Sequence, residues 1–140
     1  MDFVYNDGGR SLAGYKGHTG DCVVRAVSIA TGQPYQTVYD LFNELSTEER
    51  RCRQRRSNSR TGVRRTTIKK YLLSLGWVWT ATTTIGSGCK VHLKKDELPS
   101  GIVVCSVSRH ITVVIDGTIN DTYNPSRNET RCVYGYYTKP

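Results

Sequence analysis

Cys22 is the first residue whose position in the sequence points to chemistry. It follows Gly20-Asp21 and begins the run CVVRAVSIATG, whose apolar residues recur at helical spacing. Backbone N–H groups and the macrodipole at a helix N-terminus lower the pKa of a thiol placed there. This position predicts a nucleophile, and an inert core cysteine is the alternative if the chain supplies no base.

A histidine and an aspartate lie on two later runs that we expect to form a β-hairpin. The runs HITVVI and TINDTY are separated by Asp116-Gly117, a pair that favours a two-residue hairpin turn. In that register His110 and Asp121 are diagonal neighbours on one face of the sheet, whereas Asn120 points to the other face. The register therefore selects Asp121 as the carboxylate partner of His110.

A thiol, an imidazole and a carboxylate supply the nucleophile, the base and the orienting group of amide hydrolysis. The segments GDCVVRAVSIATG and RHITVVIDGTINDTYNP resemble the papain-like cysteine peptidase superfamily, in particular small bacterial and phage members similar to bacteriocin-leader peptidases. In those proteins a cysteine-bearing helix packs on a sheet that carries His and then Asp or Asn. The resemblance implies that Cys22 is the nucleophile, His110 the general base and acid, and Asp121 the orienting residue.

The oxyanion donor is where the sequence departs from that family. Papain-like enzymes usually carry a glutamine about six residues before the cysteine, a position that Lys16 occupies here. We therefore expect Lys16, His18 or Asn6 to complete the oxyanion hole together with the backbone N–H of Cys22.

The elements that must position these groups follow from periodicity and from helix-ending residues. A first helix is expected from Cys22 to Gly32, capped by Thr19 or Asp21, and a second one after Pro34. A third helix is expected to begin at Thr66 or Thr67 and to stop at Gly76. The expected strands are 77–84, 102–107, 110–115, 118–123 and 131–138, after a loop-rich lead-in over the first 20 residues.

Helices that precede antiparallel strands indicate the α+β class. We expect one papain-like domain over 1–140, with N-terminal helices packed on a C-terminal antiparallel sheet. No apolar run is long enough to span a membrane, and the acidic, glycine-rich N-terminus does not resemble a secretory signal.

The net charge of +8 belongs to one segment. Between Thr47 and Lys70 lie ten basic residues and two acidic ones, so the rest of the chain is neutral. The stretch at 47–65 has no apolar face and is expected to be a mobile basic segment. Its candidate partner-binding residues are Arg50, Arg51, Arg53, Arg55 and Arg56. A solvated charged loop, or a site that docks an acidic protein, is favoured over a nucleic-acid site, because no aromatic residues alternate with the arginines for base stacking.

The number and spacing of the cysteines predict their redox state. Five cysteines with irregular spacing fit reduced thiols in a cytoplasm, which is the host cytoplasm if a phage encodes the chain. Cys89-Lys-Val-His92 has metal-ligand spacing, but no second pair completes a tetrahedral set. We expect neither a metal nor another cofactor.

Together these features predict a cysteine-dependent hydrolase that cleaves a peptide or isopeptide bond with a Cys-His-Asp triad. An acyltransferase would use the same triad. The alternative from another class is a catalytically silent papain-fold module that binds a host protein or nucleic acid through the basic segment.

Overall fold

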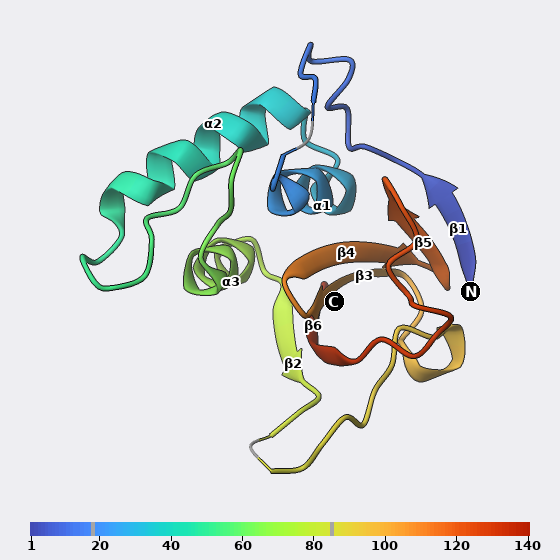
Figure 1. The fold of residues 1–140 in the computed structure, drawn as a ribbon. Coiled ribbons are helices and arrows are strands. Elements are labelled where there is room, and N and C mark those ends of the chain that lie inside the picture. Colours follow the sequence, from blue (N-terminus) through green and yellow to red (C-terminus); the bar gives the residue numbers. More distant parts are fainter. Residues whose placement is uncertain (18, 85) are drawn as a thin grey trace.

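The computed structural model describes residues 1–17, 19–84 and 86–140, and it has an α+β fold. Helices lie mostly in the N-terminal half and pack on one mixed sheet (Figure 1). The helices are α1 (Cys22–Thr31), α2 (Tyr35–Leu45) and α3 (Arg65–Ser74), with short 3₁₀ turns at Ser46–Glu48 and Lys95–Glu97. The strands are β1 (Asp2–Tyr5), β2 (Val78–Ala81), β3 (Ile102–Val107), β4 (His110–Ile115), β5 (Thr118–Asp121) and β6 (Val133–Thr138).

The six strands follow the order β1-β5-β4-β3-β6-β2. The β4–β5 hairpin pairs Ile115 with Thr118 and Val113 with Asn120, so the register expected from the Asp116-Gly117 turn is confirmed. Both turn residues have the positive φ angles, 47° and 82°, that a tight hairpin of this kind requires.

The expectation of a purely antiparallel sheet preceded by a loop was wrong at the N-terminus. Residues Asp2–Tyr5 form β1, which pairs in parallel with β5. All four side chains of β1 are exposed, so no alternation of apolar and polar residues marks it as a strand. It is held by backbone pairing to the free edge of β5, a long-range interaction that composition does not reveal.

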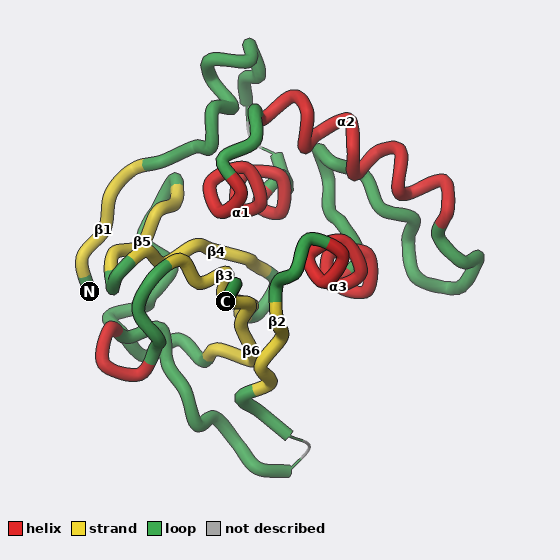
Figure 2. The backbone as a smooth tube through the Cα atoms, turned by 180° about the vertical axis from the view of Figure 1, so that it is seen from behind, coloured by secondary structure: helices red, strands yellow, loops and turns green. Residues whose placement is uncertain are grey.

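Two apolar layers hold the sheet. In Figure 1, α1 lies across β4, and α2 and α3 complete the layer on that side. Its core includes Val24, Val27, Phe42, Leu72 and Val113. A second cluster covers the opposite face and includes Val103, Val107, Val114, Ile119 and Leu93, the last from the long connection between β2 and β3. Figure 2 shows that connection from behind; its one helical segment is the short 3₁₀ turn at Lys95–Glu97, and α1, α2 and α3 lie on the other side of the sheet.

The basic segment is a loop organised around one buried arginine. The Arg64 guanidinium donates hydrogen bonds to the backbone carbonyls of Arg50, Gln54 and Arg55, and it pairs with Glu49 at 3.6 Å. The five arginines singled out as candidate partner-binding residues are all exposed. Thus a single guanidinium fixes the path of the segment and leaves its other cations at the surface; its mobility stays a prediction.

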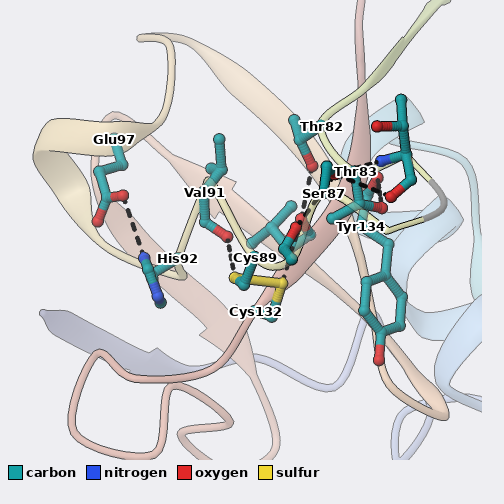
Figure 3. The surroundings of a disulfide bond; sticks show 12 residues. Thr82, Thr83, Ser87, Cys89, Val91, His92, Glu97, Cys132 and Tyr134 are labelled. Atoms are coloured by element: carbon teal, nitrogen blue, oxygen red, sulfur yellow. Dashed lines mark hydrogen bonds and ion pairs between the residues drawn. A yellow bond between two sulfur atoms is a disulfide. The ribbon is translucent and has the colours of Figure 1, made fainter.

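Cys89 and Cys132 form a disulfide, which corrects the expectation that both are reduced (Figure 3). They are 43 residues apart in the sequence, and no framework spacing identifies them as a pair. Backbone hydrogen bonds on either side bring them together: Leu93 N–H donates to the carbonyl of Arg131, and Val133 N–H donates to that of Val91. Cys22, Cys52 and Cys105 are free thiols. None of the helices described has the length and apolar character needed to cross a membrane.

Candidate active site

The thiol stands at the first position of α1, as expected. Asp21 occupies the N-cap position, but its carboxylate accepts no hydrogen bond from the first turn of the helix. The expectation that Asp21 caps the helix through its side chain is therefore wrong. The first backbone N–H groups of the helix therefore retain hydrogen-bonding capacity next to the sulfur. Gly20 is required just before: a Cβ there would lie 2.8 Å from the carbonyl oxygen of Thr61.

His110 and Asp121 lie at one end of the sheet, where β4 begins and β5 ends. The His110 Nε2 atom is 2.7 Å from Asp121 Oδ2, and both side chains are buried. Since Nε2 is occupied by the carboxylate, Nδ1 is the ring nitrogen left to face the thiol. Asn120 uses its side chain elsewhere: its amide nitrogen donates to the carbonyl of Thr118, and its oxygen accepts from Asn6.

The electrostatics couple the three groups. Burial alone would raise the pKa of the Cys22 thiol, but the hydrogen bond and charge of His110 and the backbone N–H of Ile111 leave that pKa below its usual value. For His110, burial acts to lower the pKa, and the hydrogen bonds to Asp121 and Cys22 outweigh it and raise the pKa to about 9. The pKa of Asp121 is lowered against its burial by His110. These opposite shifts favour a thiolate–imidazolium pair at neutral pH.

Behind the trio lies a buried ion network that sequence reasoning missed. Arg25 donates from Nε to Asp21 at 3.1 Å, and from Nη1 to Asp121 Oδ1 at 3.0 Å. Asp21 also pairs with Arg10 at 3.1 Å and accepts a hydrogen bond from the Tyr35 hydroxyl at 2.6 Å. The i,i+4 spacing of Asp21 and Arg25 on the helix that carries the thiol was the available signal.

A cleft of about 380 Å³ opens over Cys22 and His110. Part of its wall comes from the basic segment and the start of α3, including Gln54, Thr61 and Arg65. Arg65 is tied to the end of β3, since its guanidinium donates to the carbonyl of Val107 at 2.7 Å. The cleft therefore brings the basic segment next to the thiol.

The three oxyanion candidates are distributed differently. Asn6 lies at the closed back of the site, in a gap beside Arg25 and Asn120 with no room for a water molecule. Lys16 is exposed and does not line the cleft over Cys22. His18 lies outside the described residues. Gln54, which the sequence analysis did not single out because it follows the cysteine, does line that cleft.

No metal site competes with this arrangement in the part of the chain described: no group of three histidine, cysteine, aspartate or glutamate side chains could hold an ion. Cys89 is bonded to Cys132, and the His92 ring is 3.2 Å from Glu97 (Figure 3). Comparison of the chain with protein-family models, with curated proteins and with solved structures finds no match.

Proposed function

We propose that the chain is a thiol hydrolase that cleaves a peptide or isopeptide bond, with Cys22 as nucleophile, His110 as acid and base, and Asp121 as orienting residue. The observation that carries the proposal is the 2.7 Å contact of His110 with Asp121 beside a thiol at a helix N-terminus. A buried cysteine without these partners behaves differently in this same chain. Burial raises the pKa of Cys105 to about 12.

The proposed reaction begins with the Cys22 thiolate and the His110 imidazolium. The sulfur attacks the carbonyl carbon, and the C=O electron pair moves to the oxygen to form a tetrahedral oxyanion. The Cys22 backbone N–H and a second donor stabilise that oxyanion. The C–N bond then breaks as His110 gives its proton to the leaving nitrogen, which departs as an amine. A thioester remains on Cys22.

Water completes the cycle. Neutral His110 takes a proton from water as its oxygen attacks the thioester carbon, and the C–S bond breaks to release a carboxylic acid and regenerate the thiolate. Asp121 holds the imidazole ring through both steps and stabilises its charged form. An amine in place of water would make the same site an acyltransferase.

We also propose that the α+β fold of the chain is papain-like. A helix that carries cysteine at its first residue, packed on a sheet that carries His and then Asp, is similar to the papain-like arrangement. The second donor that we propose for the oxyanion is the side-chain amide of Gln54, since Gln54 is one of the residues that line the cleft over Cys22. A glutamine would thus reach the site from a segment that follows the nucleophile.

Competitive labelling with iodoacetamide, read residue by residue, tests the proposal. Cys22 should be alkylated faster than exposed Cys52 at pH 6–7, although Cys52 is the more accessible thiol. His110→Ala should remove that advantage, and His92→Ala is the matched control. If Cys52 reacts faster than Cys22 in the native protein, the assignment of the nucleophile is wrong. Release of amine from a peptide library, lost in Cys22→Ala, tests the hydrolysis itself.

A further inference from the structure

A second hollow adjoins the cleft and has a different character. It measures about 580 Å³, and three arginines, Arg109, Arg127 and Arg131, line it together with His110 and Tyr123. We refer to it as the arginine pocket. No acidic side chain lines it, and the described residues place no carboxylate within ion-pair distance of the three guanidinium groups.

Arg131 is a buried residue of the pocket wall. It is only 8% exposed, and its two Nη atoms donate to the carbonyls of Ser108 and, at 3.5 Å, Pro125. Its Nε atom is buried and has no hydrogen-bond partner among the described residues. A buried guanidinium without a carboxylate is unfavourable unless a ligand supplies the missing charge. Arg25 and Arg64, the other two buried arginines, both have such a partner within the chain.

The two exposed arginines of the pocket stand on tight turns of the backbone. Arg109 and Arg127 have φ angles of 56° and 52°, in the left-handed region that side-chain-bearing residues seldom adopt. Arg127 begins three consecutive left-handed residues, closed by hydrogen bonds from the N–H groups of Thr130 and Arg131 to the carbonyl of Ser126. Both cations therefore project from tight turns of defined geometry.

The two hollows share Arg109 and His110, so they meet at these two residues. In the proposed reaction the leaving nitrogen must lie close to His110, which protonates it. The chain that follows this nitrogen then runs past His110, away from Cys22. Its route leads towards the arginine pocket.

We propose that the arginine pocket binds a carboxylate carried by the leaving-group side of the substrate. The preference for an anionic group follows from the uncompensated arginines, whereas the choice of a carboxylate and its assignment to the leaving side rest on the proposed function. The carboxylate is an acidic side chain or the terminal carboxylate of the released segment, and both would meet the same guanidinium groups.

Peptide binding to the Cys22→Ala protein, followed by NMR chemical shifts, tests the pocket without thiol chemistry. The probes are Gly-Glu-Gly amide, Gly-Gln-Gly amide and Gly-Gln-Gly with a free C-terminus. At least one carboxylate-bearing peptide should bind about tenfold or more tightly than the neutral amide, since hydrogen bonds to charged groups are stronger than neutral ones. The first and third probes distinguish a side chain from a terminus as the source.

Matched variants test whether the pocket arginines cause the preference for a carboxylate. The preference should disappear in Arg109→Gln/Arg127→Gln and persist in Lys90→Gln/Lys139→Gln, which removes the same charge from exposed sites outside the pocket. Equal binding of all three peptides, no binding of any, or a preference that survives the arginine substitutions would overturn the proposal. A preference that depends on the arginines, in a protein that cleaves no peptide, would uphold the pocket and count against the hydrolase.

Discussion

Arg25 and Arg64 are both buried, yet they hold opposite kinds of structure. Arg25 is surrounded by side-chain carboxylates, those of Asp21 and Asp121, and so connects the helix that carries the thiol to the end of β5. Arg64 binds mostly backbone carbonyls and so fixes the path of a loop. The contacts of Arg25 therefore set the charges near the thiol, and those of Arg64 set the path of the basic segment. Disruption of the two should therefore have different chemical consequences at Cys22.

The largest effect is expected for Arg25→Met. It leaves two buried carboxylates without their shared cation, and loss of one partner of a buried ion pair costs about 3–5 kcal/mol of stability. Because the Arg25 charge also acts to lower the pKa of Cys22, alkylation at pH 6–7 should slow as well. Chemical denaturation and labelling measure both effects, with exposed Lys139→Met as control. A loss of stability no larger than that of the control would contradict the structural role of the network.

Arg64→Met should destabilise the fold by less, about 2–3 kcal/mol, as three carbonyls and Glu49 lose their donor. The labelling rate of Cys22 per folded molecule should stay within about twofold, since the Arg64 guanidinium contacts Glu49 and backbone carbonyls of the basic segment and not the thiol or His110. If Arg64→Met slowed labelling as much as Arg25→Met, the claim that, of the two arginines, only Arg25 acts on the charge of the thiol would be wrong.

Asp121→Ala separates the orienting carboxylate from its neighbour. Without it, His110 loses the contact that raises its pKa, and labelling of Cys22 at pH 6–7 should fall by about tenfold or more. Asn120→Ala removes a side chain of similar size one residue away and should change the rate far less. Equal rates in the two variants would mean that Asp121 does not act through His110.

The pH dependence offers a finer measure. Turnover should rise with pH as Cys22 ionises below its ordinary pKa of 9.0, and it should fall near pH 9 as His110 loses the proton it must donate. Alkylation needs only the thiolate, so its rate should rise over the first range without falling over the second. In His110→Ala the alkylation limb should move to higher pH, because burial then acts on the thiol without the histidine.

The smallest effect on the site is expected from the exposed part of the basic segment. Reversing Arg50, Arg51, Arg53 and Arg55 to glutamate should leave the labelling of Cys22 nearly unchanged, because these side chains are exposed. Arg56 is left intact since it donates to the carbonyl of Ser46 at 2.8 Å. Binding of an acidic partner should weaken and lose its salt dependence. A fall in melting temperature comparable to that of Arg64→Met would show that these charges belong to the fold.

Local signals explain what the sequence predicted well. The Asp116-Gly117 turn fixes a register by its own backbone geometry, and α1 begins at Cys22 where its apolar period begins. The missed features depend on partners distant in sequence: β1 forms on an edge over 110 residues away, and Arg64 recruits carbonyls from a stretch with no periodicity. Cys89 and Cys132 likewise meet only because two loops pair. Gln54 escaped notice because a papain-like motif directs attention upstream of the cysteine.

The disulfide also determines which residues of the site stay together when the protein begins to unfold. The covalent ring that it closes runs from residue 89 to residue 132, so it encloses His110 and Asp121 and leaves Cys22 outside. The imidazole and the carboxylate thus remain on one tethered hairpin even when the helical layer loosens, whereas the thiol reaches them only through non-covalent packing of α1. On gradual denaturation with the disulfide intact, the contact between Cys22 and His110 should be lost before the contact between His110 and Asp121.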